Sequence, residues 1–130
     1  MQYIGKLDKE KLGKYKYIII TDEVIISEER ITHIKEHHPE LINNEIIYIK
    51  DVLGDPDYIF EDRKNIDTIL MIKNIDKTYK DYRLVVKLNT NKNLKEKSNT
   101  IISFWKINKK KLGQFIRNEK IIFEKLDKSE

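Results

Sequence analysis

Two stretches in the second half of the chain decide its fold, TILMIKNI at residues 68–75 and YRLVVKL at residues 82–88. Both are rich in the β-branched and aliphatic residues that strands favour, and only a short polar segment separates them. Side chains alternate between the two faces of a strand, so the second stretch has one cationic face and one apolar face. The cationic face holds Arg83, Val85 and Lys87, and the apolar face holds Leu84, Val86 and Leu88. The short connection predicts that the two strands pair antiparallel.

Further short strands are predicted on either side of this pair. They cover Tyr3 to Leu7, Tyr15 to Ile20, Tyr58 to Phe60, Thr100 to Ile107 and Lys120 to Leu126. In the fourth of these strands, alternation places Ile101, Ser103 and Trp105 together on one face. The stretch from Asn89 to Asn99 is polar and predicts a loop.

Helices are predicted before the strands and near the end of the chain. Ser27 is a good N-cap for a helix that Pro39 limits at about His38. A second helix fits Glu40 to Leu53, and a short basic helix fits Lys109 to Arg117. We therefore predict an α+β fold, with an antiparallel sheet of about four to five strands. In this prediction the two N-terminal helices pack on one face, and the short basic helix precedes the last strand.

The composition bounds the class of protein. A length of 130 residues fits one domain, and we expect a single domain over residues 1–130. The absence of cysteine excludes disulfides and thiolate metal sites. No apolar run approaches the roughly 18 residues of a membrane span, and Met1 to Lys6 lacks the apolar core of a signal peptide. We expect a soluble cytoplasmic protein without a membrane partner.

The positive charge is concentrated in one part of the chain. The formal net charge is +4 and the pI is near 9.1. Residues 91–118 contain eight Lys or Arg against one Glu, a net +7, so the remainder carries −3. This distribution favours an anionic partner such as RNA, although a solvated surface produces the same pattern.

All three histidines fall within six positions of the first predicted helix. Histidine changes charge between about pH 5 and 8, so a cluster of histidines is a candidate site for acid/base catalysis. At about 100° per residue, Arg30, His33 and His37 share one side of the helix. His38 lies on the apolar stripe that should face the sheet, which is also typical of a structural histidine at a helix end.

A metal site is an alternative use of this cluster. His33 and His37 have the i,i+4 spacing that can place two imidazoles on one ion. The glutamate that zinc proteases require after the first histidine is missing, because Ile34 follows His33. A third ligand would have to be a carboxylate. We expect neither a metal nor any other cofactor.

The predicted strands offer the other groups that metal-free RNA cleavage needs. The reaction requires a base for the 2′-hydroxyl proton, an acid for the leaving 5′-oxygen, and cations for the charged phosphorane. Histidine together with Arg83, Lys87 and Ser103 supplies these residue types. The predicted substrate-binding residues are Arg30, Arg83, Trp105 and Lys106, with the indole as a stacking surface. An edge strand with one solvated face and Trp105 in the core would give the same pattern.

Four short motifs follow one another in a recognisable order. They are Glu29-Arg30 with His33-Ile34 and His38-Pro39, then Asp55-Pro56-Asp57-Tyr58-Ile59, then the strand over residues 83–88, and finally Asn99 to Trp105. In order and spacing, over roughly residues 20 to 126, the chain resembles a phage- and mobile-element-associated nuclease family. This family is grouped with the barnase, EndoU, colicin and RelE-like ribonuclease fold.

The resemblance implies an α+β domain with helices on an antiparallel sheet, and metal-independent RNA cleavage by a toxin or effector. It places catalytic roles on His33, His38, Lys87 and Ser103, the last at a position where threonine is expected more often. His37 falls at a position expected to be variable and often basic. Helix geometry instead pairs His33 with His37, since His33 and His38 lie about 140° apart on an ideal helix.

Two hypotheses of different classes follow. The first is an endoribonuclease that acts on RNA and is held in check by an antitoxin or immunity protein. The second is a non-catalytic RNA- or protein-binding module of the same fold, motivated by the net +7 of residues 91–118. Cleavage of RNA in EDTA would favour the first, and salt-sensitive binding without fragments would favour the second.

Overall fold

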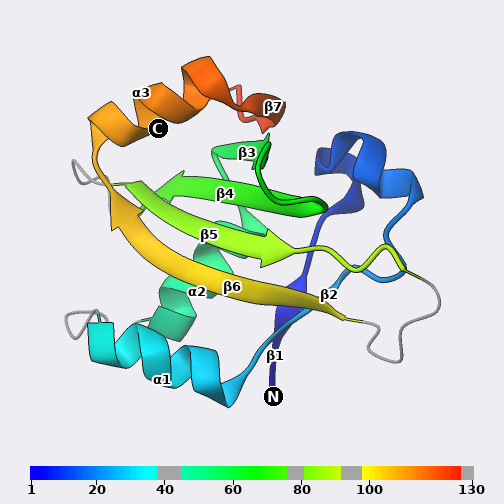
Figure 1. Cartoon of the computed structure of the whole chain (residues 1–130), viewed down its shortest axis with the longest axis vertical. Coiled ribbons are helices and arrows are strands. Elements are labelled where there is room, and N and C mark those ends of the chain that lie inside the picture. The colour runs from blue at the N-terminus through cyan, green and yellow to red at the C-terminus, as the bar shows by residue number, and fades with distance from the viewer. Residues whose placement is uncertain (38–44, 76–80, 92–97, 127–130) are drawn as a thin grey trace.

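A single sheet of seven strands dominates the described part of the chain, residues 1–37, 45–75, 81–91 and 98–126 of a computed structural model (Figure 1). The strands are β1 (Gln2–Lys6), β2 (Glu23–Ile26), β3 (Tyr58–Glu61), β4 (Thr68–Asn74), β5 (Asp81–Lys87), β6 (Asn99–Ile107) and β7 (Lys120–Glu124). The α-helices are α1 (Glu28–His37), α2 (Glu45–Gly54) and α3 (Lys109–Asn118), and two 3₁₀ helices cover Lys9–Lys11 and Gly13–Tyr17.

The strand order is β1-β2-β6-β5-β4-β3-β7. Strands β2 and β6 run parallel, and every other neighbouring pair is antiparallel. The consecutive antiparallel strands β3, β4 and β5 agree with the short connections in the sequence. The helix over Lys109–Asn118 and the last strand are also close to their predicted positions.

The predicted fold, built on an antiparallel sheet of four to five strands, is wrong. The described residues form a mixed sheet of seven strands with three α-helices. The difference arises because the β1–β2 hairpin joins β6 through a short parallel pair, in which Val24 lies opposite Asn99 and Ile25 opposite Thr100. Partners so distant in the chain leave no local pattern in the sequence.

The strand predicted for Tyr15 to Ile20 is also wrong. The chain forms a 3₁₀ helix over Gly13–Tyr17, which buries Leu12, Tyr15 and Ile19. Their spacing of three and four residues is a helical period, whereas a half-buried strand would bury every second residue. Gly13 begins this turn with a φ of 57°, a left-handed conformation that glycine adopts without steric cost.

The two faces of the sheet bury separate apolar clusters. The larger cluster includes Ile31 and Ile34 of α1 and Ile49 and Val52 of α2, so these helices cover one face. Phe115 of α3 packs into the smaller cluster on the opposite face. That cluster also contains Phe60, Leu70, Ile72 and Ile107. Figure 1 shows α3 on one side of the strands and α2 on the other.

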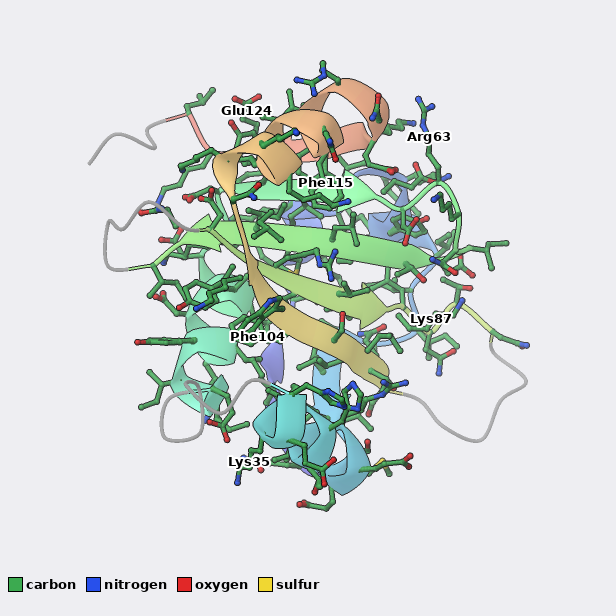
Figure 2. All side chains as sticks on the ribbon, turned by 60° about the vertical axis from the view of Figure 1, so that its left-hand side comes forward. Lys35, Arg63, Lys87, Phe104, Phe115 and Glu124 are labelled. Atoms are coloured by element: carbon green, nitrogen blue, oxygen red, sulfur yellow. The ribbon has the colours of Figure 1, made fainter. Side chains whose placement is uncertain are left out.

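Helix α3 covers only part of its face of the sheet. Its first turn is tied to the start of β5 by an ion pair between Lys109 and Asp81, with 3.0 Å between Nζ and Oδ2. Lys87 lies at the other end of β5 and is exposed. In Figure 2, Phe115 points from α3 onto the strands, whereas Lys87 stands clear of α3 at their far end. The uncovered end of this face is where the predicted cations meet solvent.

Candidate functional site

Helix α1 presents two of the three histidines to solvent. Its N-terminus is capped as predicted, because the amide of Arg30 donates to the Ser27 hydroxyl at 3.1 Å. Ile31 and Ile34 face the core, which leaves His33 and His37 exposed on the other side of the helix. Their ring centroids are 4.3 Å apart. The structure therefore brings together the pair that helical spacing predicts.

A shallow pocket on α1 surrounds the first of these histidines. It has a volume of about 390 Å³. Its lining consists of Glu29, Arg30, Thr32, His33 and Glu36. Arg30 and His33 thus share one site, as predicted from the helix geometry. His38, the second histidine of the family-like motif, lies outside the described residues.

Helix α1 lies next to β6, the strand beside the one that carries the predicted cations Arg83 and Lys87. Helix α1 contacts β6, and β6 pairs along its length with β5. Figure 2 shows α1 along one side of the strands and α3 along the other. The strip formed by β5 and β6 therefore lies between the histidine helix and the basic helix.

Directly opposed residues of β5 and β6 share one face of this strip. Arg83 lies opposite Trp105, and Val85 lies opposite Ser103. Lys87 lies opposite Thr100 on one side and Thr68 on the other. Since opposed residues project from the same face, Arg83, Ser103 and Lys87 belong to one surface. The alternation predicted for residues 82–88 is confirmed, with Leu84, Val86 and Leu88 buried.

The prediction that Ile101 shares a face with Ser103 and Trp105 is wrong. The register shifts between Val85 and Val86, so that Ser103 pairs with the former and Ile101 with the latter. Ile102 is the extra residue of this β-bulge. A bulge interrupts the alternation of side chains, and Ile101 is therefore buried in the larger core cluster.

Arg83 is the most buried cation of the strip. Burial lowers the pKa of its guanidinium below the usual value, and the negative charge of Asp62 partly opposes this shift. Among the described residues, its Nε is buried and has no hydrogen-bond partner. A desolvated guanidinium with an unused donor is suited to an anionic ligand such as phosphate.

Lys87 stands at the junction of two pockets. The first, of about 460 Å³, extends over the sheet face and includes Thr68, Val85 and Ile102. The second, of about 310 Å³, extends past the end of β5. The Nζ of Lys87 donates to the carbonyl of Ile66 at 2.5 Å, which directs the side chain along the strand ends. An ammonium has three donors, so this bond leaves capacity for a ligand in either pocket.

Trp105 and Lys106, two of the predicted substrate-binding residues, are partly buried. Trp105 is partly buried and packs against the larger core cluster. Lys106 lies opposite Tyr82, which projects from the other face, and its Nζ is 5.0 Å from the centroid of the Trp105 ring. Trp105 thus makes the core contacts of the alternative that the sequence left open, and its role as a stacking surface stays a prediction.

The structure adds residues that the sequence did not single out. Asn99, at the start of β6, is wholly buried, and its amide donates to the carbonyls of Thr21 and Glu23 at 2.9 Å. Its Oδ1 accepts the amide of Asn89 at 2.9 Å. Asp67 has a positive φ of 55° and accepts a bond from the Thr90 hydroxyl. The recognisable signal was Asn99 itself, a polar residue at the head of an apolar strand.

No group of three or more His, Cys, Asp or Glu side chains within the described ranges has the arrangement of a metal site. None of the described helices combines the length and apolar character needed to cross a membrane. The groups that the structure does assemble are histidines on α1 and cations, hydroxyls and amides on the β5–β6 strip.

The family comparison now gives this arrangement a class. A nuclease family model matches residues 2–114, which include α1, the β5–β6 strip and the first turns of α3. The chain belongs to the phage-Barnase-EndoU-ColicinE5/D-RelE like nuclease3 family. Neither a curated protein nor a solved structure matches it.

Proposed function

We propose that this nuclease is a metal-independent endoribonuclease of toxin or effector type, acting on RNA as a single domain. The observation that carries the proposal is the placement of the exposed His33–His37 pair on the helix that contacts β6. Strand β6 pairs with β5, so that Ser103 of β6 projects from the same face as Arg83 and Lys87 of β5. The proton-transfer groups on α1 and the cations on β5 are thus separated by a single strand, β6. Cleavage of a phosphodiester through its own 2′-hydroxyl needs both kinds of group.

The proposed reaction begins when a neutral histidine removes the proton from the ribose 2′-oxygen. The 2′-oxygen forms a bond to phosphorus, and the bond from phosphorus to the 5′-oxygen breaks. A protonated histidine donates its proton to the departing 5′-oxygen. The products are a 2′,3′-cyclic phosphate and a free 5′-hydroxyl, so that atoms and protons balance without a further reactant.

The remaining groups would stabilise the charge that develops on phosphorus. Arg83 and Lys87 are the cations of the strip, and Ser103 adds a hydroxyl between them, opposite Val85. Fixed cations in a partly desolvated site stabilise a phosphorane more strongly than solvated cations do. Arg30, beside His33 on α1, would hold a neighbouring phosphate.

His33 is the first acid/base group of the proposal, and either of two neighbours serves as the second. The family-like motif favours His38. The structure places His37 next to His33, with 4.3 Å between ring centroids. Single alanine variants of all three histidines distinguish these assignments.

The test is cleavage of mixed-sequence RNA in EDTA by the purified chain. General acid/base catalysis contributes about 10²–10⁴-fold, so His33→Ala should reduce the rate by about 100-fold or more. Lys50→Ala, at an exposed position on α2 outside these pockets, is the control and should retain the rate. Lys87→Met and Ser103→Ala should also slow cleavage, and the fragments should end in 2′,3′-cyclic phosphate.

Several results would overturn the proposal. Equal cleavage by His33→Ala and the wild-type chain would remove histidine catalysis. Activity that disappears in EDTA and returns with a divalent cation would indicate a metal-dependent nuclease. Binding of RNA that weakens with salt but yields no fragments would indicate the non-catalytic module instead.

A further inference from the structure

We propose that the pocket beyond Lys87, formed by Asp67, Asn89, Thr90, Ser98 and Thr100, binds the nucleobase next to the scissile phosphate and selects bases with an exocyclic amino group over uracil. This inference rests on the proposed RNA cleavage and names the part of the substrate that the site reads. The volume of about 310 Å³ lies at the lower end of ligand pockets, which span about 300–1,000 Å³. A single nucleotide unit is therefore a suitable occupant.

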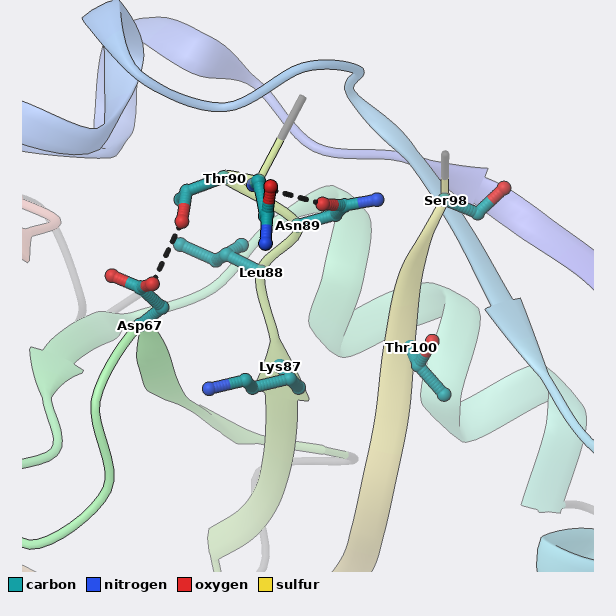
Figure 3. Close-up of a pocket in the computed structure, with 8 residues that line it drawn as sticks. Asp67, Lys87, Leu88, Asn89, Thr90, Ser98 and Thr100 are labelled. Carbon is teal, nitrogen blue, oxygen red and sulfur yellow. Dashed lines mark hydrogen bonds between the residues drawn. The ribbon is translucent and has the colours of Figure 1, made fainter. Parts of the chain in front are cut away.

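The pocket is continuous with the proposed cleavage site through one residue. Lys87 lines both this pocket and the one over the sheet face. Figure 3 shows Lys87, Asp67 and Thr90 on one side, with Ser98 and Thr100 on the other. A phosphate held by Lys87 would leave its attached nucleoside beside these polar groups.

The polar wall of the pocket is held rigidly. Buried Asn99 binds the amide of Asn89, the carbonyl of Thr21 just before β2 and the carbonyl of Glu23 at the start of β2. These bonds join three parts of the chain. The Oδ1 of Asn89 in turn accepts the amide of Asn91 at 3.1 Å. Leu88 is buried beneath this wall and supplies an apolar surface. Fixed polar groups beside an apolar surface are typical of sites that orient a flat ligand.

Asp67 supplies the selectivity. Its Oδ2 accepts the Thr90 hydroxyl at 2.7 Å, and its carbonyl accepts the amide of Leu88 at 2.7 Å. These bonds hold its backbone at a φ of 55°, a conformation that is uncommon outside glycine. Among the described residues, no Lys or Arg forms an ion pair with this carboxylate, so its Oδ1 is suited to accept bonds from a ligand.

A carboxylate accepts hydrogen bonds and cannot donate them when ionised. Adenine, cytosine and guanine each carry an exocyclic amino group that donates, as in the pairing of Asp or Glu with cytosine N4. Uracil has no amino group, and its one donor on the pairing edge, N3–H, lies between two carbonyl oxygens that a carboxylate repels. Asp67 therefore favours the three amino-bearing bases.

The first experiment measures cleavage of short RNAs that differ in the bases flanking one cleavable linkage. The wild-type chain should cleave the linkage about tenfold more slowly when uracil occupies one of the flanking positions than when another base does. A roughly tenfold change in rate is the size expected for one good base contact. Asp67→Asn should bring the four rates to within about twofold of one another, because an amide can also donate to uracil. Asparagine tolerates a positive φ, so the backbone should be retained.

Controls separate base reading from a change in charge or in folding. Asp51→Asn removes the same charge from an exposed site on α2 and should leave the base preference unchanged. Thr90→Val removes the hydroxyl that orients Asp67 and should weaken the preference even if Asp67→Asn fails to fold.

The second experiment follows binding of adenosine, cytidine, guanosine and uridine 3′-monophosphates by NMR. The amide signals of Leu88 and Thr90 should shift, with uridine the weakest ligand, and Asp67→Asn should abolish the difference. If RNA is cut without base preference and these amides do not move, the base pocket is overturned and the nuclease proposal stands. If RNA is not cut but the nucleotide ranking and its loss in Asp67→Asn are seen, the base pocket stands and the nuclease proposal falls.

Discussion

At the scale of single residues, Tyr15 links the 3₁₀ helix to the sheet by a buried hydroxyl. The hydroxyl donates to Oε1 of Glu61 on β3 at 3.2 Å. Burial, reinforced by the negative charge of Glu61, raises the pKa of Tyr15 from 10.0 to about 12. Lys14, 2.8 Å from the same carboxylate, lowers the pKa of Glu61. The tyrosine is thus kept neutral and bonded to a carboxylate that stays ionised.

Tyr15→Phe should lower the free energy of unfolding by about 1 kcal/mol near neutral pH, because one hydrogen bond is lost. The folded protein holds the Tyr15 proton more tightly than the unfolded chain does. This contribution is therefore complete below pH 10 and is lost as the pH rises towards about 12. Urea unfolding at a series of pH values should show the two proteins converging over that interval. Tyr17→Phe, at an exposed position, should match the wild type throughout. A constant difference up to pH 12 would contradict the assignment.

At the scale of elements, the short helix α1 depends on its cap to present the histidines. Its first turn carries Glu28 and Glu29, whose charges favour a helix N-terminus. Within the described length of α1, Ile31 and Ile34 are the only side chains that are buried. Ser27 adds two bonds at the N-terminus, from the amides of Arg30 and Ile31 to its hydroxyl and its carbonyl. The local interactions that define the start of α1 were recognisable in the sequence because they lie within one turn.

Ser27→Ala should therefore reduce the free energy of unfolding by about 1 kcal/mol, the usual effect of losing an N-cap. Ser27→Asp keeps a side-chain acceptor and should restore most of that stability. Urea unfolding gives the stability, and the RNA-cleavage rate shows whether loosening the helix disturbs His33. Equal stability of the alanine and aspartate variants would mean that the cap contributes nothing measurable.

At the scale of the whole molecule, some of the basic side chains of α3 contact other residues of the fold and others are exposed. In α3, Lys109 pairs with buried Asp81, and Lys111 lies over the Phe115 ring at 5.3 Å. Lys110 and Arg117 are exposed. Part of the net +7 of residues 91–118 therefore takes part in contacts within the fold, and another part is exposed to solvent.

The double variant Lys110→Gln/Arg117→Gln should weaken RNA binding and reduce its salt dependence. Each phosphate contact to single-stranded nucleic acid contributes about 0.7 to the slope of log affinity against log salt, so losing two should reduce the slope by about 1.4. The measurement uses the His33→Ala background, in which RNA remains intact. Lys9→Gln/Lys50→Gln, which removes two exposed lysines elsewhere, should leave the slope unchanged. Equal slopes for both double variants would show that α3 does not contact RNA.

By itself, the sequence determined the local elements of this protein. The alternation over residues 82–88, the cap at Ser27 and the basic helix over Lys109–Asn118 all follow from interactions between near neighbours. The order of short motifs also indicated the nuclease family, to which the chain belongs.

Only the tertiary structure decided how these elements meet. It joined β2 to β6 in parallel, moved Ile101 to the opposite face through the bulge at Ile102, and buried Asn99 beneath the pocket that contains Asp67. Hydrophobic periodicity shows which face of a strand is buried. It does not show which distant strand will pair with it through backbone hydrogen bonds. Strand β2 lies far from β6 in the chain, so its pairing with β6 depends on the packing of the complete sheet.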